Sequence, residues 1–251
     1  MPKIAIIAAM EREVRPLVRV WKVREIERDG RRYRLFENGD AALICGGIGA
    51  EAARRAAEAV IGEVNPVRVW SVGFAGALDG SLAVGQVFEP RTVINARDGS
   101  RMDTGCGQGS LVTAGAVADR DQKTRLAKAY GAVAVDMEAA AVAQAGEARG
   151  VQFGAVKAIS DAVDFSLPAM DRFIAGDGTF RAAAFAAHIA ARPWLWGRTV
   201  ALARNAAKAS QALCAAIACH LGGESLNIRD SVEVSSPPKQ SLGRAPSRVS
   251  R

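Results

Sequence analysis

Short apolar runs, each followed by a stretch with helical character, most constrain what this chain can fold into. The run at 3–9 is continuous and apolar, as in a strand covered on both faces, and a polar helical segment follows over 11–20. Further strands are predicted at 67–72, 86–93, 111–114, 133–135 and 151–159, and helices at 50–62, 121–130 and 139–149. Strands that alternate with helices indicate an α/β protein.

An early hairpin modifies that architecture. Two strand-like segments, 33–37 and 41–45, flank a turn signal of Asn, Gly and Asp at 38–40. A hairpin pairs its strands antiparallel, so the sheet is predicted to be mixed. We expect a single domain over residues 1–221, with a mixed central sheet flanked by helices.

The C-terminal tail, residues 222–251, is predicted to be disordered. It is rich in Ser and Pro, and so small an apolar area cannot offset the entropy cost of ordering it. Part of the net charge of +7 lies in this tail. No aromatic residue stands among these charges to stack on bases, so a solvated tail is favoured over a nucleic-acid partner, which is the alternative.

Cysteine, histidine, metal and cofactor chemistry are not indicated. The four cysteines are widely separated and lack CxxC spacing, and the two histidines lie in Ala-rich stretches near the C-terminus. We therefore expect no disulfide framework, no zinc site, no His-based triad and no dinucleotide cofactor. The apolar runs are too short to span a membrane and the N-terminus has no signal-peptide layout, so a cytoplasmic protein is expected.

Carboxylates follow three of the predicted strands. Glu11 and Glu13 come after the first strand, and Asp136 and Glu138 after the strand at 133–135. Ser160, Asp161 and Asp164 come after the strand at 151–159. Ligands in an open α/β sheet bind beyond the C-terminal ends of the strands. For any one of these strand ends, an acid that caps the next helix is the better explanation, but three acidic strand ends in one sheet favour a site.

Such a set of carboxylates suits the cleavage of an N-glycosidic bond. Carboxyl groups stabilise a cationic transition state and deliver a proton to the leaving group. Adenine leaves as an anion unless its N7 is protonated, so a carboxylic acid with a raised pKa is useful there. The ribosyl cation also needs its hydroxyls held and a nucleophile delivered.

Five ordered segments between residues 3 and 165 carry a family resemblance. They are 6–14, 46–49, 73–78, 135–141 and 157–161, of which Asp-Met-Glu-Ala-Ala and Ala-Ile-Ser-Asp are the most specific. The chain resembles the nucleoside phosphorylase superfamily and, within it, the methylthioadenosine/S-adenosylhomocysteine nucleosidases. The resemblance implies the fold of that superfamily, with no cofactor and a homodimeric assembly.

The resemblance also implies roles for individual residues. Glu138 would hydrogen-bond the ribose 2′- and 3′-hydroxyls, while Met137 packs against the sugar. Asp161, oriented by Ser160, would protonate the purine as a general acid. Glu13 falls where the nucleosidases place the carboxylate that activates the attacking water.

Other positions depart from the nucleosidase pattern or leave the nucleophile open. Phe74 stands where those enzymes have a Ser in the turn that ends at Gly76, and Val117 takes the place of the aromatic that stacks on adenine. The glycines Gly47 and Gly49 precede a helix, so their loop is a candidate phosphate cradle and equally a plain turn. Water and phosphate both remain candidates for the nucleophile.

The last third of the chain adds a second, looser resemblance. After a helical stretch at 170–191, Trp194 and Trp196 lead into a helix with basic and apolar residues, which suits a membrane interface or a long apolar ligand. The alternative is that the tryptophans pack in the core or in a dimer interface. This ending is similar to that of the hopanoid-associated phosphorylases, which remove adenine from an adenosyl-hopane lipid.

The predicted function is therefore the release of adenine from a 5′-substituted adenosine, with an adenosyl-lipid as the favoured substrate. A methylthioadenosine/S-adenosylhomocysteine nucleosidase is one alternative. A protein that binds a nucleoside and leaves its glycosidic bond intact is another.

Overall fold

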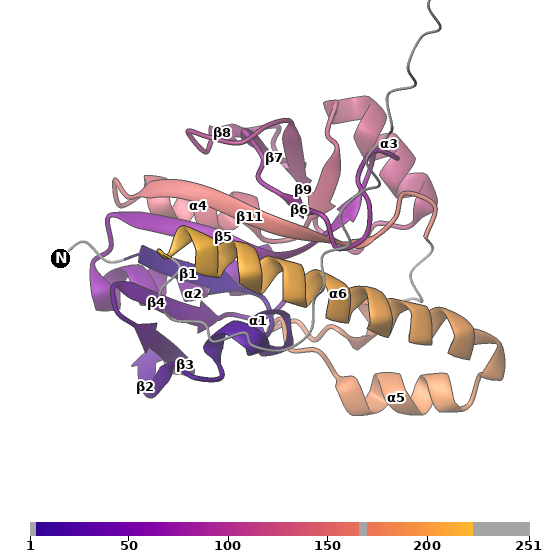
Figure 1. Ribbon diagram of the computed structural model, residues 1–251, viewed down its shortest axis with the longest axis horizontal. Coiled ribbons are helices and arrows are strands. Elements are labelled where there is room, and N and C mark those ends of the chain that lie inside the picture. Colours follow the sequence, from indigo (N-terminus) through magenta and orange to yellow (C-terminus); the bar gives the residue numbers. More distant parts are fainter. Residues whose placement is uncertain (1–3, 166–169, 223–251) are drawn as a thin grey trace, which may run out of the picture.

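The computed structural model describes residues 4–165 and 170–222, and it has the predicted mixed sheet flanked by helices (Figure 1). The main path of the sheet runs in the order β2-β3-β4-β1-β5-β10-β9-β7-β8, and β11 pairs with β5 and β6. The strands are β1 (Ile4–Ala8), β2 (Lys22–Arg28), β3 (Arg31–Asn38), β4 (Ala41–Cys45), β5 (Arg68–Ala77), β6 (Val87–Phe88), β7 (Thr92–Asn95), β8 (Arg101–Asp103), β9 (Ser110–Thr113), β10 (Ala134–Asp136) and β11 (Gln152–Asp161). The helices are α1 (Glu11–Val18), α2 (Ala50–Val64), α3 (Arg120–Tyr130), α4 (Ala139–Glu147), α5 (Ala182–Ala190) and α6 (Trp196–His220), with 3-10 turns at Asp171–Phe173 and Pro193–Leu195.

The first strand lies in the middle of the sheet, as its continuous apolar run predicts. β1 pairs in parallel with β4 on one side and β5 on the other. Successive side chains of a strand point to opposite faces, so Ala5 and Ile7 pack in the core under α2 and α4, whereas Ile6 and Ala8 pack in the core under α1 and α6. Burial on both faces is the reason that this strand lacks polar alternation.

Two groups of parallel strands meet at β5 with opposite directions. β4, β1, β5 and β11 run parallel to one another, and β10, β9 and β7 form a second parallel group. β10 pairs antiparallel with the end of β5, through Ala134 with Ala77 and Val135 with Gly76. The C-terminal ends of both groups therefore approach each other, which brings strand ends from the two groups to one place.

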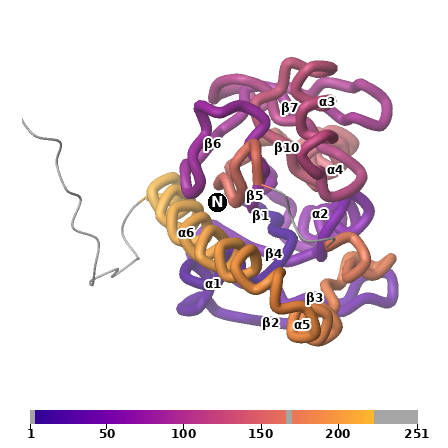
Figure 2. Tube along the Cα trace, turned by 90° about the vertical axis from the view of Figure 1, so that its right-hand side faces the viewer, coloured from indigo at the N-terminus to yellow at the C-terminus, as the bar shows by residue number. Residues whose placement is uncertain are grey.

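The long helix α6 covers one face of the sheet and extends beyond its edge. Figure 1 shows α6 crossing β11 and β5 and then continuing outward, with α5 beside its outer end. In the turned view of Figure 2, α6 and α1 lie on one side of the sheet and α2 and α4 on the other. The buried residues Ala209, Leu213 and Ile217 fix α6 to the sheet.

Several predicted element bounds are corrected by the structure. β5 continues through Gly73 to Ala77, so the glycine-rich segment is strand rather than the turn after a strand. The strand predicted at 86–93 is divided into β6 and β7, with Pro90, which lacks an N–H donor, between them. The stretch at 170–191 is α-helical only over Ala182–Ala190, after the 3-10 turn and a bridge between Ile174 and Phe180.

Two edge strands were not predicted from the sequence. β2 is an edge strand in which Ile26 is the one buried residue, so it has no buried face to produce an alternating pattern. β8 is three residues long, which is too short for any periodicity.

The tail predicted from residue 222 onward lies, apart from Gly222 itself, outside the described residues. Within 4–165 and 170–222, no helix is both long enough and apolar enough to cross a membrane. All four cysteines have free thiols.

Candidate active site

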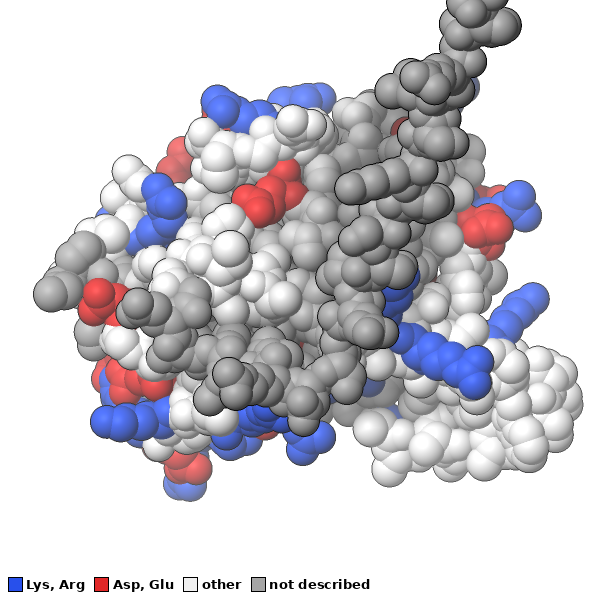
Figure 3. Space-filling view, in the orientation of Figure 1, with Lys and Arg blue, Asp and Glu red and all other residues white. Residues whose placement is uncertain are grey.

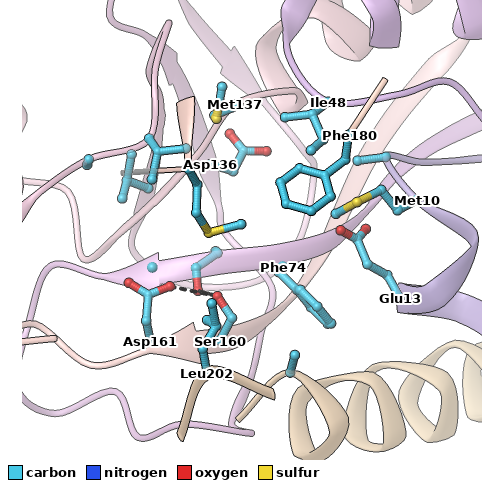
Figure 4. Close-up of a pocket in the computed structure, with 18 of the residues that line it drawn as sticks. Met10, Glu13, Ile48, Phe74, Asp136, Met137, Ser160, Asp161, Phe180 and Leu202 are labelled. Atoms are coloured by element: carbon cyan, nitrogen blue, oxygen red, sulfur yellow. Dashed lines mark hydrogen bonds between the residues drawn. The ribbon is translucent and has the colours of Figure 1, made fainter. Parts of the chain in front are cut away.

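A cavity of about 260 Å³ lies where the two groups of strands converge (Figure 4). It brings together the eight residues that the sequence predicted for catalysis and for substrate binding: Glu13, Phe74, Gly76, Val117, Met137, Glu138, Ser160 and Asp161. They come from α1, β5, the loop before α3, the end of β10 and the end of β11. Residues up to 148 positions apart in the sequence thus line one space, from Glu13 to Asp161.

Glu13 is a buried carboxyl with one unused oxygen. Its side chain is 3% exposed and Oε2 has no hydrogen-bond partner among the described residues. Gly73 leaves room for it, since a Cβ at Gly73 would lie 2.9 Å from Oε2. Burial, followed by the charge of Glu138, raises the pKa of Glu13 to about 8, against smaller lowering effects of Lys157 and Arg12. A carboxylate with a pKa near neutrality and an open lone pair is suited to be a general base.

Glu138, the residue before α4, has its carboxyl group held by two backbone N–H groups. Its Oε1 accepts from the N–H of Gly49 at 2.8 Å and its Oε2 from the N–H of Met137 at 3.2 Å. Burial and then the neighbouring Asp136 raise its pKa to about 7, while Lys157 and these N–H groups lower it. The carboxylate is therefore oriented, and its remaining lone pairs can accept hydrogen bonds from the hydroxyls of a ligand.

Asp136 is committed to the protein itself. It forms an ion pair with Lys157 at 2.8 Å and accepts hydrogen bonds from Thr113 Oγ1 at 2.7 Å and the N–H of Ala139 at 2.9 Å. Lys157 also donates to Ser71 Oγ at 2.9 Å. This buried pair anchors the end of β10, and with it Glu138, to β11. Sequence reasoning missed Lys157, which stands inside an apolar strand segment.

Asp161 accepts hydrogen bonds through both carboxylate oxygens. Ser160 Oγ donates to Oδ1 at 2.7 Å, as predicted and as Figure 4 shows. Lys123 Nζ, from α3, donates to Oδ2 and also to the carbonyl of Ala162 at 2.7 Å. Lys123 was not predicted, because it is one of several charged residues on a largely polar helix and no sequence signal separates it from the others.

The side of the cavity next to α5 and α6 is apolar. Phe180, from the loop before α5, and Phe185, from α5, line the cavity together with Leu202 and Ala206 of α6. Phe74 also contributes to this wall and packs against the core beneath α6, and in Figure 4 it lies between Glu13 and Leu202. The cavity lining therefore combines the polar groups at the strand ends with hydrophobic side chains from α5, α6 and the loop before α5.

The loop at 46–49 uses its N–H groups within the protein, which favours a plain turn over the phosphate cradle, the two possibilities that the sequence left open. The N–H groups of Gly46 and Gly47 donate to the carbonyls of Ala8 and Ala9, and that of Ile48 donates to the carbonyl of Gly178. The N–H of Gly49 is used by Glu138. Gly47 and Gly49 have φ angles of 105° and 97°, so their sequence signal reflects a tight turn.

Trp194 and Trp196 do not pack in the core of the chain, so of the predicted alternatives the membrane interface, the apolar ligand and the dimer interface stay predictions. They are 73% and 53% exposed, although Trp196 Nε1 donates to the carbonyl of Ile189 at 3.0 Å.

Within the described part of the chain, no group of three or more His, Cys, Asp or Glu residues is placed to hold a metal ion.

Solved structures with this fold include nucleosidases. A 5′-methylthioadenosine/S-adenosylhomocysteine nucleosidase of Neisseria meningitidis, in complex with methylthio-immucillin-A, is 19% identical with a TM-score of 0.67, over 89% of this chain and 100% of that one. An S-adenosylhomocysteine nucleosidase of Streptococcus pyogenes is 26% identical with a TM-score of 0.57, over 65% and 86%. The futalosine hydrolase of Helicobacter pylori is 19% identical with a TM-score of 0.56, over 64% and 88%. A search of curated proteins finds no match.

A family model described as the phosphorylase superfamily matches the chain over residues 3–112 and 108–191. These two stretches contain β1 to β11, α1 to α5 and every charged residue that lines the cavity. The match thus covers both the sheet and the site, and the chain belongs to the phosphorylase superfamily.

Proposed function

We propose that this protein cleaves the N-glycosidic bond of a 5′-substituted adenosine and releases adenine. The observation that carries the proposal is the meeting of three carboxyl groups, Glu13, Glu138 and Asp161, in one cavity without a metal-binding cluster among the described residues. The structures of methylthioadenosine and S-adenosylhomocysteine nucleosidases and of a futalosine hydrolase support it through their shared fold.

Each carboxyl group has surroundings that suit one task in this reaction. Glu138, oriented by two backbone N–H groups, accepts hydrogen bonds from the ribose hydroxyls, with Met137 against the sugar. Asp161 and Ser160 lie at the purine and assist protonation of N7. Glu13 takes a proton from the attacking water, since its free Oε2 lies in the cavity wall and its pKa is about 8.

Water is the nucleophile that the site favours. An adjacent carboxylate activates water but repels a phosphate anion, and the N–H groups of the loop at 46–49 are already used within the protein. Phosphate is the second candidate, because Arg12 also lines the cavity and supplies one cation near Glu13. The guanidinium of Arg12 stacks over Phe180, with its Cζ 5.2 Å from the ring centroid.

A long apolar group is the 5′-substituent that the cavity favours. Phe180, Phe185, Leu202 and Ala206 give the cavity an apolar lining on the side of α5 and α6, and Arg12, which stacks on Phe180, is the charged side chain beside them. An adenosyl-lipid therefore fits this end of the cavity better than a small polar substrate.

The exposed end of α6 is suited to contact a membrane that holds such a lipid. Trp194, Trp196 and Val200 are exposed, and Arg198 and Arg204 are exposed on the same helix. Figure 3 shows Lys and Arg side chains beside the largely uncharged surface of α5 and α6. Tryptophan and basic residues together favour a peripheral site at an anionic membrane surface. Vesicle sedimentation with Trp194→Ser and Trp196→Ser variants tests this contact.

Adenine release tests the proposed function directly. The purified protein is incubated with methylthioadenosine, S-adenosylhomocysteine and an adenosine that carries a long 5′-alkyl chain, each with and without phosphate. We expect release from the long-chain substrate without phosphate. Release that requires phosphate would identify the second candidate, and release confined to the small substrates would refute the apolar 5′-substituent.

No release from any substrate would instead favour a protein that binds a nucleoside without cleaving it. Binding of the same compounds, measured by calorimetry, separates that outcome from a site that does not take nucleosides at all.

A further inference from the structure

Lys123 is a buried cation in the wall of the cavity. It is 1% exposed, lines the cavity with its partner Asp161, and reaches the site from α3 across 38 residues of sequence. It donates to Asp161 Oδ2 and to the carbonyl of Ala162 at 2.7 Å. Two of the three donor positions of its ammonium group are thereby occupied within the protein.

The hydrogen bonds of Asp161 are those of a carboxylate rather than of a carboxylic acid. Ser160 Oγ donates to one oxygen and Lys123 to the other, so both oxygens act as acceptors. A lone carboxylic acid that protonates a purine must carry the proton itself. In this structure, the group that donates a hydrogen bond to Asp161 Oδ2 is the Nζ of Lys123.

The space around this pair is closely fitted. A Cβ at Gly76 would lie 2.9 Å from Asp161 Oδ2 and 3.3 Å from Lys123 Cε, so the glycine of β5 lets the pair approach the strand. Burial of an ion pair is costly and often gives no net gain in stability over apolar residues of the same volume. Burial is shared with the pair of Lys157 and Asp136, but Lys123 and its partner both line the cavity, whereas Lys157 does not.

Resting on the function proposed above, we propose that Lys123 is the proton source for the leaving adenine and passes its proton through Asp161. As the bond between C1′ and N9 breaks, its electron pair moves into the purine. Asp161 gives a proton to N7, and Lys123 Nζ gives a proton to Asp161. Adenine leaves neutral, Asp161 ends as the carboxylate, and Lys123 ends as a neutral amine that regains its proton from water after product release.

Among the described residues, the other charged groups of the cavity are carboxyls or are placed elsewhere. Lys123 is therefore the cation that accompanies Asp161 at the purine end of the site. The carboxyls of Glu13, Asp136 and Glu138 line the same cavity, and Arg12 lies on the α1 side with Phe180. On α3 itself, Asp119 caps the helix and Asp121 is exposed, and on β11 Lys157 is paired with Asp136.

The pH dependence of turnover separates a proton source from a structural cation. In Lys123→Met, Asp161 must carry the transferred proton alone, so adenine release should fall as the pH rises from 5 to 8. We expect a loss of about 100-fold or more at pH 8 and a much smaller loss at pH 5. Lys123→Arg keeps a cation beside Asp161, which opposes protonation of the carboxylate, and does not release its own proton, so its loss should be large at pH 5 as well as at pH 8.

The leaving group gives a second readout. A 2-fluoroadenine analogue of the substrate has the same shape and amino group but a more stable anion, so it needs less proton transfer. Lys123→Met should therefore lose several-fold less activity with 2-fluoroadenine than with adenine as the leaving group. Lys128→Met, an exposed position on the same helix, is the matched control and should retain wild-type rates.

Folding and function are kept apart by two further measurements. Circular dichroism and thermal unfolding report whether Lys123→Met is folded. If Lys123→Met does not fold, the double variant Lys123→Met with Asp161→Asn removes both charges of the pair. A loss in Lys123→Met that is equal at every pH and for both leaving groups would overturn the proposal. Wild-type protein that releases no adenine would refute the proposed function itself and this inference with it.

Discussion

Glu13 differs from an ordinary surface glutamate in what surrounds each of its oxygens. Its Oε2 has no partner among the described residues, and burial and the charge of Glu138 raise its pKa to about 8. A group that is partly ionised near neutrality accepts a proton from water and loses it again without a large cost in free energy.

Glu13→Gln is expected to lose turnover by about 100-fold or more if water is the nucleophile, because the amide cannot take the proton. A phosphate-dependent reaction should lose little, since phosphate needs no base. Adenine release with and without phosphate measures the difference. Glu11→Gln, on the same turn of α1 and paired with Arg34, is the control.

At the scale of elements, β5 and α6 decide the shape of the site. β5 carries glycines where side chains of the site approach its backbone, and α6 supplies the apolar wall. Changes in β5 are therefore expected to displace the carboxyl groups of the site, whereas changes in α6 are expected to alter the apolar part of the cavity.

Gly76→Ala is expected to impair catalysis more than folding. The new methyl group would meet Asp161 Oδ2 at 2.9 Å and Lys123 Cε at 3.3 Å, so the pair must move away from the purine. We expect kcat to fall by at least about 10-fold, as a displacement of roughly 1 Å in a catalytic group commonly does. Gly80→Ala, which meets nothing within 4 Å, should retain wild-type kcat.

Ala206→Phe is expected to change substrate preference. The larger side chain fills the apolar part of the cavity beside Leu202, so release from the long-chain adenosine should fall while release from methylthioadenosine is retained. Ratios of kcat/KM for the two substrates measure the effect. Ala215→Phe, exposed on the same helix, is the control, and an equal loss for both substrates would show that the wall does not hold the 5′-group.

For the whole molecule, the buried carboxyl groups link stability to pH. The pKa values of Glu13 and Glu138 are raised to about 8 and about 7 in the folded chain, so the folded state binds more protons than the unfolded state above pH 4.5. The stabilisation is complete below that pH and is lost as the pH rises through 7 and 8.

Urea unfolding at pH 5 and pH 9 is expected to show a lower free energy of unfolding for the wild type at pH 9. Glu13→Gln stays neutral in both conditions, so its stability relative to the wild type should rise with pH by on the order of 3 kcal/mol. A difference between the two proteins that is the same at both pH values would mean that Glu13 is ionised in the folded chain at low pH.

Much of the fold and of the site was predictable from local patterns. Continuous apolar runs predicted the central strands, and carboxylates after those runs predicted Glu13, Glu138 and Asp161 as site residues, because a strand end and its next few residues are contiguous in sequence. The glycines of the loop at 46–49 also had a readable signal, but the sequence left open whether their N–H groups face a ligand or the protein.

Tertiary structure alone decided which partners those residues have. Lys123 meets Asp161, Lys157 meets Asp136, and Gly49 donates to Glu138 through contacts between segments distant in the chain. The antiparallel junction of β5 and β10 turns two sets of strand ends toward one cavity. Sequence patterns reflect burial and local geometry, whereas the pairing of charges depends on how helices and strands pack, and it is this pairing that determines the chemistry open to each carboxyl group.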